Sequence, residues 1–342
     1  MTAVLGAGRS TREGDWSRFL RWLVSSAALS FVLALLFLLA VDPYDSGRTG
    51  LFAGSGVPSQ FPTTANASRA RDPSFDAAIF GNSHIQQVSP ERLRALTGLA
   101  PVSLIIPGTG PADQLAVLGR FLATRTRPPR AIVIGTDAFW CRPTMEFLPR
   151  FPAWLYDPSF LVYLGGLVRY RSIEAAFSRL AFLRSGQGGA RRDGYWDYRP
   201  YFAEVGLEDQ QASRRRVLED PGLSFGPNPQ GVFPAFEALR QLLRRAPAET
   251  IFVLVRPPVY ASSFPAPGTA EARTQEKCRQ AIGEIAAEFP SVRLIDLLEP
   301  GPIASDVDNF YDREHYRDPI AAEIERRIAE ELRRQPPAGR GG

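Results

Sequence analysis

The chain has 342 residues, of which 44% are hydrophobic, 22% charged and 11% aromatic. These fractions are typical of a folded protein, so they exclude the disordered, collagen-like and low-complexity classes. The net charge is only +4, and no Lys/Arg block or zinc-finger spacing occurs, so nothing indicates a nucleic-acid partner. Two cysteines, Cys141 and Cys278, are too few for a Cys-rich zinc site, and sequence alone leaves open whether they pair.

Residues 22–41 form an apolar run without a charged side chain. As a helix, this run spans about 30 Å, the hydrocarbon thickness of a bilayer. Arginines precede it, and Asp42 and Asp45 follow it, so the positive-inside rule places residues 1–21 in the cytoplasm and the rest outside. The alternative is a cleaved signal peptide, but the apolar region is unusually long for one and no clean small-x-small site precedes Asp42. We expect an uncleaved single-pass anchor.

Residues 42–73 are rich in Gly, Pro, Ser and Thr without sustained periodicity, which indicates a flexible tether. Beyond it, short apolar runs predict five strands, at residues 75–80, 101–106, 131–134, 251–255 and 292–295. Helical patterns lie between and after them, at residues 90–97, 111–125, 160–183, 233–245, 270–289 and 319–334, the last with Asp318 as its N-cap.

Five almost wholly apolar strands that alternate with helices predict an α/β fold, a three-layer α/β/α sandwich around a parallel sheet. The predicted domain covers residues 74–335, with a mainly helical insertion at about 141–247 and a disordered tail at 336–342. The insertion is either a packing subdomain or a lid or glycan-binding wall. Parallel sheets of this kind place their sites at the carboxyl ends of the strands.

Two short segments carry side chains suited to nucleophilic catalysis. Ser83 follows the first predicted strand in the segment Gly81-Asn82-Ser83-His84, and a serine hydroxyl needs a base to become a nucleophile. Far downstream, Asp312 and His315 are three residues apart, so the carboxylate can hold one ring nitrogen while the other faces outward as a base. The plainer alternatives are that Ser83 caps a helix and that His315 pairs with Asp312 for stability.

These segments resemble the SGNH (GDSL-type) hydrolase superfamily. Within it, the chain is similar to the membrane-anchored branch of bacterial cell-envelope proteins, which includes the alginate-type O-acetylation and lipoteichoic acid D-alanylation proteins. Gly81–His84 matches the first block, with Asn82 where Asp is usual, and Asp312-x-x-His315-Tyr316 matches the last. The resemblance implies a flavodoxin-like sheet, with Ser83 as nucleophile, His315 as base and Asp312 as its orienting partner.

The resemblance also implies an oxyanion hole made by the N–H groups of Ser83 and the second-block glycine. That glycine is best placed on Gly108, with Gly110 as the alternative. The third block usually supplies an Asn, but here it reads Gly135-Thr136-Asp137, so the third donor is Thr136, a backbone N–H, or absent. Loss of one such donor typically costs about 10²–10³ in rate. His84 and Asp137 are candidate substrate-binding residues, although each also has a structural alternative.

Three functional classes follow. The first is an esterase or O-acyltransferase for acyl, above all acetyl, esters of a cell-envelope glycan. The second is a non-catalytic glycan-binding or docking component of an envelope acylation system. The third is a lipid-directed esterase. The implied place is the bacterial inner membrane with the catalytic domain in the periplasm, where acyl transfer would need a membrane-bound acyltransferase partner to deliver the donor. We expect neither a cofactor nor a metal.

Overall fold

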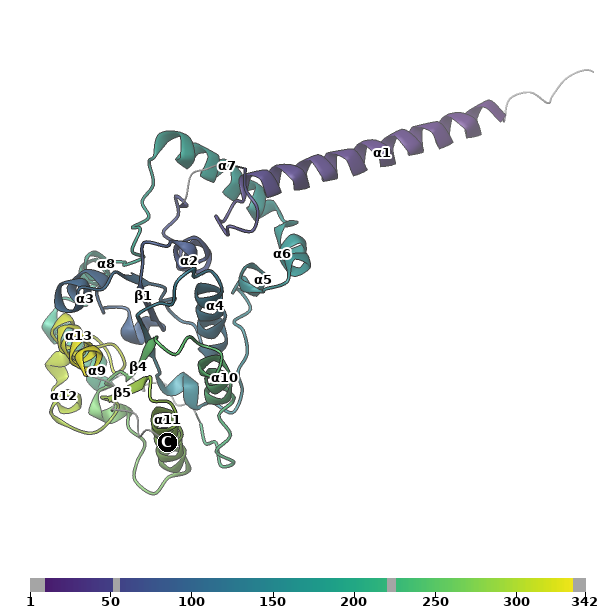
Figure 1. The fold of residues 1–342 in the computed structure, drawn as a ribbon. Helices are drawn as coiled ribbons and strands as arrows, with labels where there is room; N and C mark the ends of the chain where they lie inside the picture. Colours follow the sequence, from purple (N-terminus) through teal and green to yellow (C-terminus); the bar gives the residue numbers. More distant parts are fainter. Residues whose placement is uncertain (1–9, 52–55, 220–225, 335–342) are drawn as a thin grey trace, which may run out of the picture.

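The computed structural model describes residues 10–51, 56–219 and 226–334. Its centre is a five-stranded, wholly parallel sheet, which confirms the α/β prediction (Figure 1). The spatial order is β2-β1-β3-β4-β5. All five strands lie where the apolar runs predicted them: β1 Ala77–Phe80, β2 Pro101–Ser103, β3 Ala131–Gly135, β4 Ile251–Arg256 and β5 Val292–Asp296.

Helices cover both faces of the sheet, because alternate strand residues point to opposite sides. One face carries Phe80, Ile134 and Leu254 and packs against α4 (Pro111–Ala123), α10 (Pro234–Leu243) and α11 (Ala270–Glu288). The opposite face carries Ile79 and Val133 and packs against α3 (Pro90–Thr97) and α13 (Asp318–Arg333). Burial on both faces explains why these strands are apolar throughout rather than alternating.

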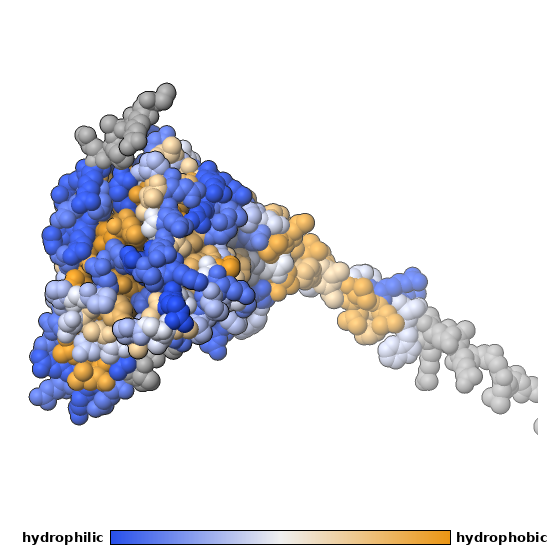
Figure 2. Space-filling model, turned by 90° about the horizontal axis from the view of Figure 1, so that it is seen from below, coloured by the Kyte–Doolittle hydropathy of each residue, from blue (hydrophilic) through white to orange (hydrophobic). Residues whose placement is uncertain are grey.

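Helix α1 (Ser10–Val41) projects from this body as a long rod (Figure 1). Its segment Trp16–Val41 is long and apolar enough to cross a membrane, with a mean hydropathy of 2.5 and 11% of its most apolar window buried. Figure 2 shows the hydrophobic rod beside a largely hydrophilic body. The exposure of its apolar side chains sets α1 apart from a core helix. Residues 1–9 and the predicted tail at 336–342 lie outside the described residues.

The segment expected to be a flexible tether is ordered where it is described, so that expectation is wrong. It contains α2 (Pro62–Arg71), whose buried alanines pack in the same core as α4. Asp42 and Asp45 are also buried. Arg179, 134 residues further along the chain, donates to Asp45 at 2.7 Å. The hydrophilic, Gly/Pro-rich composition indicated an exposed segment. Asp45 is instead buried because it pairs with Arg179, a partner distant in the sequence.

The stretch between β3 and β4 is helical in its described part. It includes α5 (Ala153–Tyr156), α6 (Phe160–Leu167), α7 (Tyr170–Ser185), α8 (Arg199–Glu204) and α9 (Gln210–Glu219), followed by α10. The single helix expected at 160–183 is divided into α6 and α7. The break falls at Val168 and Arg169, whose backbone angles are not helical, just after two adjacent glycines that weaken the end of α6.

The remaining elements differ little from expectation. The last helix begins at Asp318 with Arg317 as its N-cap, so Asp318 lies inside the first turn rather than capping it. The described residues also contain the short helix α12 (Pro302–Ser305). Four 3-10 turns lie at Ser83–Ile85, Ala138–Cys141, Ala261–Ser263 and Val307–Asn309 in the same part of the chain. Cys141 and Cys278 form a disulfide across 137 residues, which ties the end of β3 to α11.

Candidate active site

The turn after β1 presents Ser83 at the carboxyl end of the sheet. Gly81 has φ +150°, and a Cβ there would lie 2.5 Å from the Ile85 side chain, so the turn requires glycine. The Asn82 side chain accepts from the His84 N–H at 3.0 Å and donates to the Thr109 carbonyl at 3.1 Å. The Asn82 side chain therefore holds the Ser83 turn in place and ties it to the loop after β2.

His315 and Asp312 lie in a tight loop whose ends, Phe310 and Tyr316, form an isolated β-bridge. Oδ1 of Asp312 accepts the backbone N–H groups of Glu314 and His315, each at 2.8 Å. This arrangement points the carboxylate at the imidazole, and Nδ1 of His315 lies 2.8 Å from Oδ2 of Asp312. Asp312 and His315 are thus brought together by a compact loop before α13 and not by a turn of helix.

The structure brings Ser83 and His315 together although 232 residues separate them. Nε2 of His315 lies 2.8 Å from Oγ of Ser83. The three predicted residues thus form a continuous hydrogen-bonded line, Ser83–His315–Asp312. About 30% of the Asp312 and His315 side-chain surfaces are exposed, at 31% and 28%, so a small ester could reach the line from solvent.

The protonation state of Asp312 suits this line. Burial works to raise the pKa of the Asp312 carboxyl, but hydrogen bonds and charge from His315 outweigh it and hold the pKa below its usual value. Asp312 is therefore ionised at neutral pH and can accept an N–H from Nδ1 of His315. The lone pair on Nε2 then faces the Ser83 hydroxyl and can accept its proton as the serine attacks.

Two backbone N–H groups are available near Ser83. The loop after β2, which holds Gly108, lies beside the Ser83 turn, because Ile106 N–H donates to the Gly81 carbonyl at 3.0 Å and the Asn82 amide donates to the Thr109 carbonyl at 3.1 Å. In the described part of the chain, neither the Ser83 N–H nor the Gly108 N–H has a protein acceptor. The Gly110 N–H is bound to Asp113 at 3.1 Å, which favours Gly108 over Gly110.

Thr136 is not free to act as the third donor, contrary to the expectation. Its N–H and its hydroxyl both donate to the Val255 carbonyl, at 2.7 and 3.2 Å. The side chain is also buried. The reason is local: Thr136 directly follows β3 and extends the pairing with β4, a contact that the motif alone does not reveal.

His84 lies between two carboxylates rather than open to substrate. Its Nδ1 is 2.8 Å from Asp137 Oδ2, and its Nε2 is 3.4 Å from Glu314 Oε2. Burial alone would lower the pKa of His84, but hydrogen bonds and charge from Asp137 and Glu314 raise it to about 10. His84 is therefore an imidazolium at neutral pH. Because both ring nitrogens face carboxylates, it cannot serve as the base.

Asp137 is equally committed. Its Oδ2 accepts from Asn82 at 2.5 Å as well as from His84, and its Oδ1 accepts from the Phe139 N–H at 2.9 Å. His84 and Asp137 nonetheless form part of the wall of a cavity of about 270 Å³ beside the site. Its other walls come from the loop after β4, from α11 and from the segment after β5, and they include Val259, Phe264, Pro265, Glu271, Thr274, Gln275 and Leu298. Substrate contact by His84 and Asp137 stays a prediction.

Sequence reasoning missed what holds the His315 loop in place. Arg313 donates to the carbonyls of Val217 and Leu218 in α9, at 2.9 and 3.1 Å. The Phe202 ring from α8 lies 4.6 Å from that of Tyr311. The inserted helices α8 and α9 therefore support the loop that carries His315. Arg313 beside a His motif was the only local signal, and its partners lie about one hundred residues away.

No group of three or more His, Cys, Asp or Glu side chains within the described ranges is arranged to hold a metal ion. Comparison with known proteins adds no identity: no family model matches the chain, and no curated protein matches it.

Proposed function

We propose that this protein is an SGNH-type serine esterase or O-acyltransferase that acts on acyl esters, above all acetyl esters, of a cell-envelope glycan. The observation that carries the proposal is the hydrogen-bonded line from Ser83 through His315 to Asp312. The strand order β2-β1-β3-β4-β5 supports it, since this is the order of flavodoxin-like sheets. The line also lies at the carboxyl ends of the strands, where such sheets hold their sites.

The geometry supports a two-step acyl transfer. Ser83 Oγ attacks the acyl carbonyl while His315 Nε2 takes its proton, and the oxyanion is stabilised by the N–H groups of Ser83 and Gly108. His315 then gives the proton to the departing alcohol, which leaves an acyl-Ser83 ester. A water molecule or a sugar hydroxyl then attacks this ester while His315 takes its proton, and His315 passes that proton to the departing Ser83 Oγ, which restores the free serine. Water gives an esterase and a sugar hydroxyl gives a transferase.

The cavity beside the site supports a substrate with both polar and apolar parts. Phe264, Val259 and Leu298 supply apolar wall, while Glu271 and Gln275 supply hydrogen-bonding groups. A sugar ring combines an apolar face with hydroxyl groups at its edge. This mixture, more than an open lipid groove, favours a glycan ester.

The proposed setting is the outer face of a bacterial inner membrane, with α1 as a single-pass anchor. Arg18 and Arg21 lie near its start and Asp42 follows its end. There the enzyme has no access to cytosolic acyl donors, so a transferase needs a membrane-bound acyltransferase partner and an esterase needs none. An alkaline phosphatase reporter fused after Gly56 should be active, because it folds in the periplasm. An active cytosolic reporter at the same point would contradict this topology.

The enzymatic proposal is tested by p-nitrophenyl acetate hydrolysis with the full chain in detergent. Wild-type protein should release p-nitrophenol, Ser83→Ala should not, and Ser185→Ala, an exposed serine at the end of α7, should match wild type. If wild type and Ser83→Ala are equally inactive while the protein binds an envelope glycan, the non-catalytic docking component is the correct function.

A further inference from the structure

We infer that the catalytic body itself contacts the membrane, through an apolar surface on α6 and the first half of α7. We call it the α6–α7 surface; its exposed residues are Phe160, Leu161, Val168, Tyr170, Ile173 and Phe177. The inference rests on the proposed anchoring by α1 but not on the proposed chemistry of Ser83. Its ligand is the lipid of the leaflet that α1 enters.

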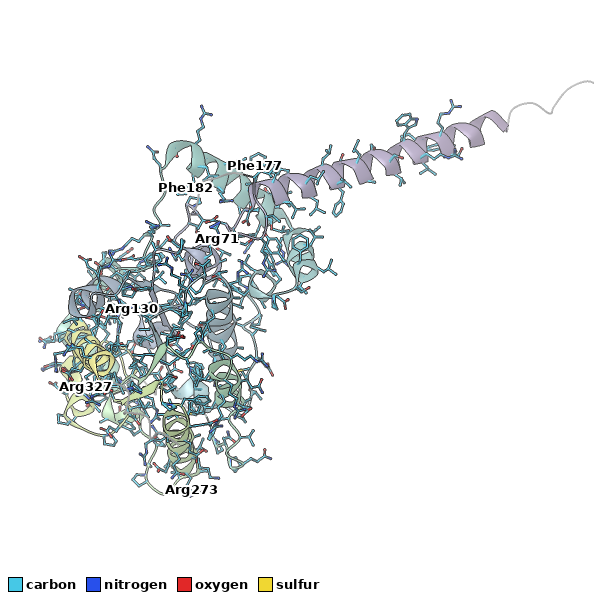
Figure 3. The ribbon with its side chains drawn as sticks, in the orientation of Figure 1. Arg71, Arg130, Phe177, Phe182, Arg273 and Arg327 are labelled. Atoms are coloured by element: carbon cyan, nitrogen blue, oxygen red, sulfur yellow. A yellow bond between two sulfur atoms is a disulfide. The ribbon has the colours of Figure 1, made fainter. Side chains whose placement is uncertain are left out.

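The surface lies beside the point where α1 leaves the body. Figure 1 shows α6 and the beginning of α7 on the side from which α1 projects. The Phe37 ring of α1 is 5.4 Å from that of Phe177, and Figure 3 places Phe177 at this junction. Where α1 enters a bilayer, the α6–α7 surface is therefore the part of the body that meets the headgroups first.

Trp16–Val41 as a whole is long enough to cross a membrane, but the exposed apolar part of α1 after Arg21 is shorter than the hydrocarbon of a bilayer. Leu38 and Val41, at its C-terminal end, are buried in the body. What remains after Arg21 is residues 22–36, about 22 Å of helix against about 30 Å of hydrocarbon. Such a shortfall is met by bilayer thinning, by snorkelling of the flanking arginines, or by drawing adjoining apolar surface into the membrane. The α6–α7 surface is such an adjoining apolar surface.

The joint between α1 and the body is rigid, so this orientation is fixed. Arg179 of α7 is buried and donates to the carbonyls of Val41 and Asp42 at the end of α1, as well as to Asp45. The Arg179 guanidinium of α7 thus donates hydrogen bonds to the carbonyl groups at the C-terminal end of α1. A body on a flexible tether could turn this surface to water, but one locked to the anchor cannot.

The composition of the surface suits a membrane interface. α6 reads FLVYLGGL, without a charge, and is apolar on both sides: Tyr163 and Leu167 face the core while Leu161 is 76% exposed. On α7, the spacing of Tyr170, Ile173 and Phe177 places all three on one face, with Tyr170 73% and Phe177 62% exposed. Aromatic and aliphatic side chains of this kind are enriched at the boundary between headgroups and acyl chains.

The charges at its edge fit anionic lipid. Arg169 and Arg171 are exposed at the junction of α6 and α7, against one exposed acid, Glu174. Basic residues near an anionic membrane surface are attracted to it. Apolar residues with basic neighbours therefore favour lipid over a protein partner as the occupant.

The test uses the full chain in vesicles of phosphatidylcholine and phosphatidylglycerol, with single cysteines carrying a spin label. Among the described residues both native cysteines are in the disulfide, so Leu161→Cys and Phe177→Cys can be labelled singly. Leu33→Cys on α1 reports membrane insertion, and Leu96→Cys, an exposed leucine on α3, is the matched control. The measurement is the collision rate of each label with a water-soluble nickel chelate.

We expect the Leu161 and Phe177 labels to lose access to nickel, as the Leu33 label does, while the Leu96 label keeps it. If Leu33 is protected but Leu161 and Phe177 behave like Leu96, the inference is wrong and the anchor stands. If Leu33 is also accessible, both are wrong. Protection of Leu161 and Phe177 in native membranes but not in pure lipid would overturn the inference in favour of a membrane-protein partner.

Discussion

Replacing Asp312 by asparagine changes catalysis through one atom, because the loop dictates how the new amide must face. In the wild type, Oδ1 accepts the backbone N–H groups of Glu314 and His315 at 2.8 Å each. In Asp312→Asn the amide oxygen must keep these two bonds, since an NH₂ group cannot accept them. The NH₂ group then takes the place of Oδ2, which lies 2.8 Å from Nδ1 of His315.

In that place the NH₂ group lies nearer to Nδ1 than the amide oxygen does, at 2.8 Å against 3.0 Å, and the amide oxygen already accepts two backbone N–H groups. The substitution therefore favours the opposite tautomer of His315, with Nδ1 bare and Nε2 protonated. Nε2–H then faces the Ser83 hydroxyl, which is 2.8 Å away, and cannot accept its proton. We expect kcat/KM to fall by about 10⁴ at neutral pH, as when a catalytic triad holds the wrong tautomer. That is about 5 kcal/mol of transition-state stabilisation.

The assay is p-nitrophenyl acetate hydrolysis by wild-type and Asp312→Asn protein at neutral pH, with thermal unfolding of both. The substitution keeps the shape of the side chain and its two backbone hydrogen bonds, so the unfolding temperature should change little. A loss of activity below about tenfold with unchanged unfolding would refute the assignment of Asp312 as the residue that orients His315.

Three further predictions follow from the structure. Ser83→Ala and His315→Ala should each abolish hydrolysis without lowering the unfolding temperature, because nucleophile and base act as one unit; an active His315→Ala would transfer the base elsewhere. The raised pKa of His84, about 10, makes its stabilising contribution complete below about pH 6.5 and lost as the pH rises through about 10. The difference in free energy of unfolding between wild type and His84→Gln, measured in urea, should therefore narrow from neutral pH to about pH 10. A constant difference would contradict the ion pairing of His84 with Asp137 and Glu314. Replacing Cys141 and Cys278 by serine should lower the free energy of unfolding by about 2–4 kcal/mol, measured by urea unfolding, and a reductant should destabilise wild type but not the variant.

The sequence predicted the sheet and the grouping of Ser83, His315 and Asp312 because both have local signals. The strands are continuous apolar runs, and Ser83 and Asp312–His315 follow or precede regular elements. What it missed depends on distant partners. The burial of Asp45 requires Arg179, a partner 134 residues further along the chain.

The expected third donor of an oxyanion hole, Thr136, shows the same contrast between local signals and distant partners. Thr136 has the chemistry of a donor, but the end of β4 already accepts both of its hydrogens. His84, conversely, has the chemistry of a base, but Asp137 and Glu314 occupy both of its nitrogens. Residue type could be read from the motifs, whereas the availability of each polar atom follows from the assembled loops.

The central claim, that Ser83 is a nucleophile that carries an acyl group, is tested most directly by mass spectrometry of the chain after exposure to an activated acetyl ester. We expect one acetyl group on the peptide that contains Ser83 in wild type, and none on that peptide in Ser83→Ala. His315→Ala should not lose the acetyl group faster than wild type, because His315 would be the base in both acylation and deacylation. An unmodified Ser83 in folded wild-type protein, or acetylation on lysine or tyrosine alone, would contradict it.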